Sequence, residues 1–261
     1  MMNRIACLGG VYSNYLALEA ALCDIARRGV DAIYCLGDLG AFGPHPDRVF
    51  PLLHAYGVQC LQGNYDDSVG NGLDDCQCGY TDPRDNHFAQ ISYDYTLQNT
   101  SVANREFLRG LPRRLVIELG DQRVMLCHGS PRRTNEFLWE STTPTHFLEK
   151  LTRDYDVDWI LATHTGIKWY RPLAGGRGFV NVGVLGRPEN DGTTQVWFTI
   201  LNHSNSGTVP QFVAVDYDYR RLADEMAAEG LPLEFQQTIL SGWWTTCLEV
   251  LPAKERRKGR F

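Results

Sequence analysis

The stretch LGDLGAFGPHP, residues 36–46, gives the clearest indication of the fold. It starts at the end of the apolar run Ala32–Leu36, which is typical of a buried strand. Glycine and aspartate follow at once, so a turn is predicted directly after the strand, with Asp38 at its carboxyl end. Pro46 is suited to the first turn of a helix over residues 46–56. A buried strand that ends in a polar turn and is followed by a helix is typical of an α/β unit.

The same order of elements is predicted on both sides of this stretch. Ile5–Leu8 precedes it as a strand, with a helix over residues 16–28 between the two strands. After it, Val58–Gln62 is predicted as a third strand that ends at Gly63. Later strands are predicted at residues 115–119, 124–127, 159–162, 178–182, 194–201 and 210–216, and later helices at residues 87–96, 101–109, 143–153, 220–229 and 233–241. The alternation at the start of the chain predicts a sheet with helices packed against it.

Length and composition limit the class of protein. A chain of 261 residues with 43% hydrophobic content can bury the core of one domain. The net charge is −6, whereas nucleic-acid-binding proteins typically carry an excess of basic residues. No nucleic-acid partner is therefore expected. No apolar run is long enough to span a bilayer, and the N-terminus lacks the pattern of a signal peptide. We therefore expect no membrane association and a cytoplasmic location.

The chain has eight cysteines, and in a cytoplasmic protein their thiols are expected to be reduced. Cys76 and Cys78 form a Cys-x-Cys pair in a loop predicted over residues 67–86, and long loops in compact domains are often functional. No second pair accompanies them at the spacing of a zinc site, so a structural zinc is the less favoured interpretation. A further interpretation is that Cys76, Cys78 or Cys247 serves as a replacement metal ligand, with the loop folded over the site.

Four polar residues each follow a predicted strand at once: Asp38, Asn64, His128 and His164. If these strands run parallel in one sheet, their carboxyl ends lie at one edge, where open α/β sheets place their sites. Taken singly, an aspartate after a strand is more often a turn former, and a histidine is more often a surface or core residue. Together, carboxylate, amide and imidazole ligands suit Mn²⁺, Fe, Zn²⁺ or Co²⁺ better than Ca²⁺. The sequence therefore predicts a metal site at this edge.

The residues around these four positions resemble the sequence blocks of the calcineurin-like metallophosphoesterase superfamily, and above all its small prokaryotic phosphodiesterase-type branch. The matching blocks, in the family's order, are Gly37-Asp38, Gly63-Asn64-Tyr65-Asp66, His128-Gly129-Ser130-Pro131, Thr163-His164-Thr165-Gly166 and the turn-rich Asn181–Pro188. The resemblance implies an α/β fold, a four-layer α/β/β/α sandwich of two mixed sheets flanked by helices. It implies a metallophosphoesterase-like domain over residues 1–232, with residues 233–261 as a C-terminal extension packed on it.

One half of the family's metal ligands is missing from this chain. The family's first block has an aspartate and a histidine where this chain has Gly10 and Tyr12, and its last block has a second histidine where this chain has Gly166. In the family pattern these three positions serve one metal ion, and the four retained residues serve the other. The resemblance therefore implies a degenerate first site and one divalent transition metal, Mn, Fe or Zn, rather than two.

The function that the resemblance implies is metal-dependent hydrolysis of a phosphomonoester or phosphodiester at a mononuclear or atypical site. Catalytic roles are then expected for Asp38, Asn64, Asp66 and His128. For Asp66 the alternative role is the cap of a helix. The alternative function is that of a catalytically inactive relative that binds a phosphorylated ligand or partner. In either case a small phosphorylated molecule is the expected partner.

Phosphate binding is expected from Tyr12, Tyr65 and Arg132, with Arg133 as the other candidate arginine. Two alternatives are open: Tyr12 fills the space of the lost metal ion, or the arginines lie in a solvated loop. The adjacent tryptophans 243 and 244 lie beyond the family match. If they are exposed, they favour a homodimer through the C-terminal segment, and otherwise this segment packs back on the body.

Overall fold

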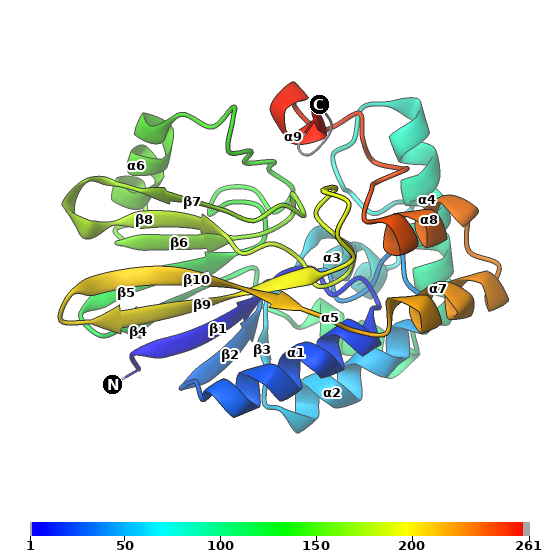
Figure 1. Ribbon diagram of the computed structural model, residues 1–261, viewed down its shortest axis with the longest axis horizontal. Coiled ribbons are helices and arrows are strands. Elements are labelled where there is room, and N and C mark those ends of the chain that lie inside the picture. Colours follow the sequence, from blue (N-terminus) through cyan, green and yellow to red (C-terminus); the bar gives the residue numbers. More distant parts are fainter. Residues whose placement is uncertain (1, 258–261) are drawn as a thin grey trace.

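The computed structural model describes residues 2–257 (Figure 1). Two sheets pack face to face, and helices cover the outer face of each sheet. The first sheet has the strand order β10-β9-β1-β2-β3 and the second has the order β4-β5-β6-β8-β7. Each sheet contains both parallel and antiparallel pairs. The predicted four-layer α/β/β/α sandwich of two mixed sheets is therefore confirmed.

The first sheet joins the start of the chain to a long hairpin near its end. Its strands are β1 (Arg4–Leu8), β2 (Ala32–Cys35), β3 (Gln59–Cys60), β9 (Val196–Ser204) and β10 (Gly207–Val215). The second sheet is built from the middle of the chain. Its strands are β4 (Arg114–Leu119), β5 (Gln122–Cys127), β6 (Trp159–Ala162), β7 (Trp169–Pro172) and β8 (Gly178–Asn181).

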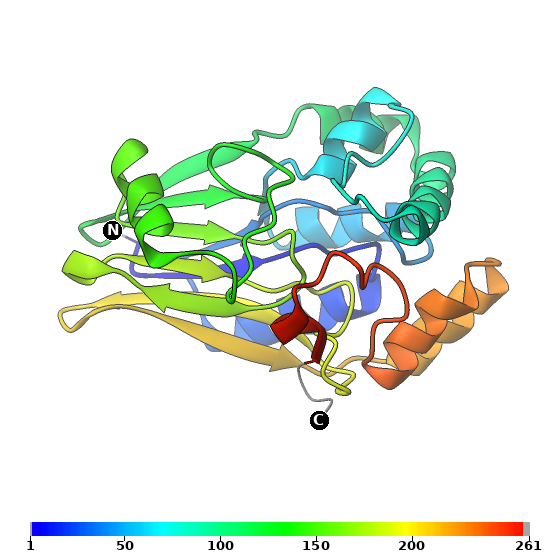
Figure 2. The same cartoon turned by 90° about the horizontal axis from the view of Figure 1, so that it is seen from above.

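The helices lie on both outer faces and at one end of the sandwich (Figures 1 and 2). Those of the first half of the chain are α1 (Tyr15–Arg28), the short 3₁₀ helix η1 (Pro46–Arg48), α2 (Val49–Ala55), α3 (Asn64–Asn71), α4 (Pro83–Asn99) and α5 (Val102–Arg109). Those of the second half are α6 (Thr145–Asp154), η2 (Ala174–Gly176), α7 (Tyr219–Ala228), α8 (Leu233–Ser241) and α9 (Ala253–Arg257). None of the helices within residues 2–257 combines the length and the apolar character needed to cross a lipid bilayer.

Strand β1 shows how the sequence divides the core between the layers. Ile5 and Cys7 belong to the apolar core between the two sheets, where they pack with residues such as Trp159 of β6. Ala6 and Leu8 belong to the other core, which includes the apolar face of α1. All four side chains of this strand are fully buried. Because side chains alternate along a strand, one short apolar run can serve both faces of a sheet.

The loop predicted over residues 67–86 is wrong at both ends. Helix α3 continues to Asn71, and Gly72, with φ of 64°, supplies the left-handed conformation that ends it. Helix α4 begins at Pro83, after Asp82 has accepted hydrogen bonds from two amides of its first turn. Gly72 and Asp82, two of the residues that favoured a loop, are therefore helix caps. Residues 72–82 are left as the connection, and they include the Cys76–Cys78 pair.

The segment after α8 crosses the end of the molecule toward which β1, β5 and β6 point (Figures 1 and 2). Trp244 in this segment is only 1% exposed. Its Nε1 donates to the carbonyl of Pro188 at 2.6 Å, and its backbone amide donates to Oδ1 of Asn190 at 2.9 Å. The segment is therefore tied to the loop that follows β8.

Candidate metal centre

The carboxyl ends of strands from both sheets carry the predicted ligands. Asp38 follows β2 and Asn64 opens α3 after β3, in the first sheet. His128 follows β5 and His164 follows β6, in the second sheet. The expectation of one shared sheet edge was therefore wrong, because the residues lie in two sheets. The parallel direction of the strands within each sheet still places them at one end of the molecule.

Three of these side chains form a compact buried cluster. Asp38, His128 and His164 each offer a ligand atom, and these atoms all lie within 4.8 Å of one another. Nε2 of His128 is 3.2 Å from Oδ2 of Asp38 and 3.2 Å from Nδ1 of His164. The exposed fractions of the three residues are between 1% and 7%. A carboxylate and two imidazoles this close, away from water, are suited to binding a cation.

The orientation of His128 fits a metal ligand. Its Nδ1 lies 2.7 Å from the carbonyl oxygen of Leu36, which can only accept, so Nδ1 carries the proton. Nε2 then presents its lone pair toward Asp38 and His164. Burial lowers the pKa of His128, but the charge and hydrogen bond of Asp38, the Leu36 carbonyl and the charge of Asp66 together outweigh it, so the net shift is upward. The carboxylate thus favours a positive charge at this point, either a proton or a metal ion.

His164 is held as a neutral imidazole. Burial and, next, the charge of His128 lower its pKa to about 3. Its Nε2 is buried and has no hydrogen-bond partner within residues 2–257. The residue has φ of 68°, a left-handed conformation that a non-glycine residue adopts only when its surroundings fix it. Asn181 helps to fix it, because Nδ2 donates to the carbonyl of Thr163 and to the hydroxyl of Thr165, both at 2.9 Å.

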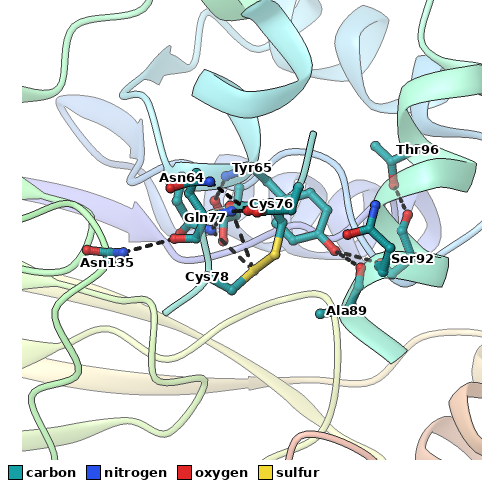
Figure 3. The surroundings of a disulfide bond; sticks show 12 residues. Asn64, Tyr65, Cys76, Gln77, Cys78, Ala89, Ser92, Thr96 and Asn135 are labelled. Atoms are coloured by element: carbon teal, nitrogen blue, oxygen red, sulfur yellow. Dashed lines mark hydrogen bonds between the residues drawn. A yellow bond between two sulfur atoms is a disulfide. The ribbon is translucent and has the colours of Figure 1, made fainter. Parts of the chain in front are cut away.

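Asn64 lies under the connection of residues 72–82 (Figure 3). Its Nδ2 donates to the carbonyl of Cys76 at 2.8 Å and to Sγ of Cys78 at 3.4 Å. Its Oδ1 is buried and has no partner within the described part of the chain. Since the amide nitrogen is fixed by Cys76, the oxygen is the atom left for a ligand. An unpartnered buried oxygen is costly, and a bound cation would satisfy it.

Cys76 and Cys78 are joined to each other by a disulfide (Figure 3). The expectation that all eight cysteines are reduced thiols is therefore wrong for these two. The loop does fold over Asn64, but its two sulfur atoms are bonded to each other and are not thiolate ligands. A two-residue separation gave no sign of this bond, because the sequence does not show that both side chains turn to the same side of the loop.

Asp66 positions Asp38. Its carboxylate accepts from the amides of Gly63 at 2.8 Å, Asp38 at 2.7 Å and Leu39 at 3.0 Å. The first of these bonds closes the cap of α3, so the helix-capping role considered for Asp66 is present. Burial and the charge of Asp38 raise the pKa of Asp66 to about 6. Its contacts are to the backbone that carries the ligand, which makes it a positioning residue.

The donor set fits the predicted transition metal. Ligand atoms of Asp38, His128 and His164 converge on one point, and Oδ1 of Asn64 is buried without a partner within residues 2–257. Oxygen and imidazole nitrogen ligands in this mixture suit Mn²⁺, Fe or Zn²⁺. Asp38, His128 and His164 are therefore the residues that would hold such an ion, and Asn64 stays a predicted fourth ligand.

The three positions without a ligand are filled by packing. Tyr12 is 4% exposed, and its ring lies against Gly10 and Gly186, where an added Cβ would meet ring atoms at 2.3 and 2.2 Å. A Cβ on Gly166 would lie 3.1 Å from the ring of Trp244. This packing agrees with the interpretation of Tyr12 as a residue that fills space, and burial raises the pKa of its hydroxyl.

Tyr65 and Arg132 are engaged elsewhere. The hydroxyl of Tyr65 is bonded to Ser92 at 2.9 Å and lies 3.3 Å from the carbonyl of Ala89 (Figure 3), so the structure does not offer it as a phosphate donor. The guanidinium of Arg132 is paired with Glu136 and lies 4.7 Å above the ring of Phe147. Phosphate binding by Tyr65 and Arg132 was expected from their positions in the sequence. Position alone does not reveal that Ser92 and Glu136 are their partners.

Sequence reasoning missed Arg187, Trp244 and Phe137. The ring of Phe137 lies 4.3 Å from that of His164, and Arg187 stacks on Trp244. Arg187 lies within the turn-rich block 181–188, which was a usable signal. Trp244 and Phe137 come from segments without a motif, so only the fold brings them to this end of the molecule.

The comparisons with known proteins agree with this fold. The model of the calcineurin-like phosphoesterase superfamily domain matches residues 4–204, and the chain therefore belongs to this superfamily. It is 25% identical over 246 residues to the uncharacterized protein MJ0912 of Methanocaldococcus jannaschii, covering 88% of this chain and 94% of that one.

Two solved structures show the same fold. A metallophosphoesterase from Sphaerobacter thermophilus is similar with a TM-score of 0.70 and 24% identity, covering 93% of this chain and 100% of that one. The hypothetical protein PH1004 from Pyrococcus horikoshii OT3 is similar with a TM-score of 0.76 and 22% identity, covering 93% and 99%. The expected superfamily is thus confirmed.

Proposed function

We propose that this protein is a metal-dependent phosphoesterase that works with one divalent transition metal ion, held by Asp38, Asn64, His128 and His164. The observation that carries the proposal is the convergence of ligand atoms from Asp38, His128 and His164 within 4.8 Å. The unpartnered Oδ1 of Asn64 supports it as a fourth ligand. Membership of a phosphoesterase superfamily supports the reaction class.

The proposed chemistry combines the properties of the metal ion with the positions in which the protein holds its ligands. When bound, a divalent transition metal supplies Lewis acidity toward a phosphoryl oxygen and makes water a stronger acid near neutral pH. The protein's own part is to fix the ligands before substrate arrives. Asp66 fixes the backbone of Asp38, and the Leu36 carbonyl fixes the tautomer of His128. A small phosphorylated molecule, monoester or diester, is the substrate class that this arrangement favours.

A non-hydrolytic binding protein is the second candidate function. The observation that favours it is the packing of Tyr12 between Gly10 and Gly186, which leaves no ligands for a second ion on that side. Relatives with two ions divide the charge of the reacting phosphate between them, so a site with one ion lacks part of that stabilisation. Such a protein would still bind a phosphorylated ligand.

Turnover measured with defined metals separates the two functions. The metal-free protein would be reconstituted with Mn²⁺, Fe²⁺ or Zn²⁺ and assayed on p-nitrophenyl phosphate and bis-p-nitrophenyl phosphate. We expect metal-dependent hydrolysis that His128→Ala removes, while His87→Ala, which changes an exposed histidine of α4, leaves it unchanged. Phosphate binding without turnover of any ester under any of the three metals would contradict the enzymatic function and support the binding protein.

A further inference from the structure

Arg187 is a buried cation without a counterion. It lies in the loop after β8 and is 6% exposed. Its Nε is buried and has no hydrogen-bond partner within residues 2–257. No carboxylate in that part of the chain lies within ion-pair distance of its guanidinium. An arginine stays charged at physiological pH, and a buried charge is normally paired, so this group calls for an anionic partner.

Aromatic rings hold the guanidinium in place. Its central carbon lies 3.5 Å from the ring centre of Trp244, 5.1 Å from that of Phe42 and 6.0 Å from that of Tyr12. Ring faces attract a cation but accept few of the five hydrogen bonds that a guanidinium can donate. The rings therefore fix the position of the charge and leave its donors for another group.

The guanidinium lies beside the metal ligands. A Cβ built on Gly166, two residues after His164, would be 3.6 Å from Nη2 of Arg187. The charge of Arg187 also contributes to lowering the pKa of His164, which agrees with this short separation. Tyr12 and Gly166, two of the three positions that lack a metal ligand, both lie near the guanidinium of Arg187.

A small cavity borders the guanidinium of Arg187. The cavity lined by Arg187, Phe42 and Thr246 has a volume of only about 10 Å³, enough for about one water molecule. The cavity is too small for a phosphate ion, so an anion would have to reach the guanidinium by another path.

We propose that Arg187 is the anion-binding residue of this site, and that its guanidinium holds phosphoryl oxygens of the ligand next to the single metal ion. The inference rests on the proposed function, which it deepens. A guanidinium can donate two parallel hydrogen bonds to one phosphoryl group. Arg187 thereby supplies a fixed positive charge on the side of the site where ligands for a second ion are absent.

Calorimetric titration of inorganic phosphate into the metal-loaded protein tests the proposal. We expect Arg187→Gln to weaken phosphate binding roughly tenfold or more, Arg187→Lys to have an intermediate effect, and Arg153→Gln to stay within about twofold of the unmodified protein. Arg153 is the matched control because it is an exposed arginine in the last turn of α6. Metal content, measured by mass spectrometry, is expected to be the same in all four proteins.

Two outcomes would overturn the proposal. One is that the unmodified protein binds no phosphate, and the other is that Arg187→Gln keeps its metal and binds phosphate with unchanged affinity. If Arg187→Gln does not fold, crystals of the unmodified protein soaked in tungstate decide the question. We expect an anomalous peak within hydrogen-bond distance of the guanidinium, and tungstate bound without contact to Arg187 would contradict the proposal.

Ester hydrolysis and phosphate binding, measured on the same proteins, test the proposed function and the role of Arg187 separately. If the unmodified protein hydrolyses no ester but loses phosphate binding in Arg187→Gln, the enzymatic function fails and the anion-binding role stands. If it hydrolyses esters and the variant binds phosphate normally, the anion-binding role fails alone.

Discussion

The two halves of the site differ in how their side chains are packed. On one side Asp38, His128 and His164 bring polar atoms together in a buried place, and Oδ1 of Asn64 is buried without a partner. On the other side the ring of Tyr12 packs tightly against two glycines. Atoms left without partners indicate that something binds, whereas close packing indicates that nothing does. The difference supports the proposal that one half holds an ion, while the ring of Tyr12 in the other half is part of the core.

The largest effect is expected from breaking the half that binds the ion. Asp38→Asn removes the negative charge that faces His128, so bound metal should fall to background and turnover should fall roughly a hundredfold or more. Metal analysis and steady-state rates measure both. Asp24→Asn is the matched control, because Asp24 pairs only with arginines on the surface of α1. Full metal content in Asp38→Asn would show that this carboxylate is not a ligand.

The packed half can be tested by restoring a histidine at position 166. Gly166 has φ of 77°, and a side chain there meets the ring of Trp244, so Gly166→His should cost about 1–3 kcal/mol of stability and add no second ion. Gly176→His is the matched control. Gly176 has a similar φ of 74° but open space around it, so the difference in unfolding free energy isolates the packing. A stable Gly166→His protein that binds a second ion would contradict the account.

A smaller effect is expected from the disulfide above Asn64. Replacing Cys76 and Cys78 together with serine frees the loop whose carbonyl holds the Asn64 amide, and metal affinity should fall roughly tenfold. Competition with a metal chelator measures the affinity. Cys23→Ser changes an exposed cysteine and should leave affinity unchanged. Unaltered affinity in the double variant would mean that the loop does not position Asn64.

The smallest effect is expected at Tyr65. Tyr65→Phe removes a buried hydrogen bond to Ser92, so the free energy of unfolding should fall by about 1 kcal/mol. Phosphate affinity and KM should not change, because the hydroxyl is already engaged. Chemical denaturation and calorimetry measure the two quantities. A strong loss of phosphate affinity with unchanged stability would restore Tyr65 as a phosphate donor.

Much of the fold was predictable because it depends on local patterns. Apolar runs such as Ile5–Leu8 and Ala32–Leu36 have the length of buried strands, and the glycine and polar residues after them mark where strands end. The positions of Asp38 and His128 at strand ends are predictable for the same reason, since each comes within two residues of the end of such a run. The resemblance to a known family supplied the two-sheet arrangement, which periodicity alone does not give.

The rest of the site depends on contacts between distant segments. Arg187 and Trp244 are 57 positions apart in the chain and meet only because the segment after α8 returns across the strand ends. The partner of Tyr65 is Ser92 on another helix, and the partner of Asn64 is a loop carbonyl. No local signal specifies such partners, so Tyr65 and Arg132 were assigned to phosphate on position alone.

Metal stoichiometry tests the central claim most directly. The protein would be loaded with excess Mn²⁺, Fe²⁺ or Zn²⁺, freed of unbound metal and weighed by native mass spectrometry, and anomalous diffraction would locate each bound ion. We predict one ion per chain, in contact with Asp38, Asn64, His128 and His164. Two ions per chain, or one ion beside Gly10, Tyr12 and Gly166, would contradict the account.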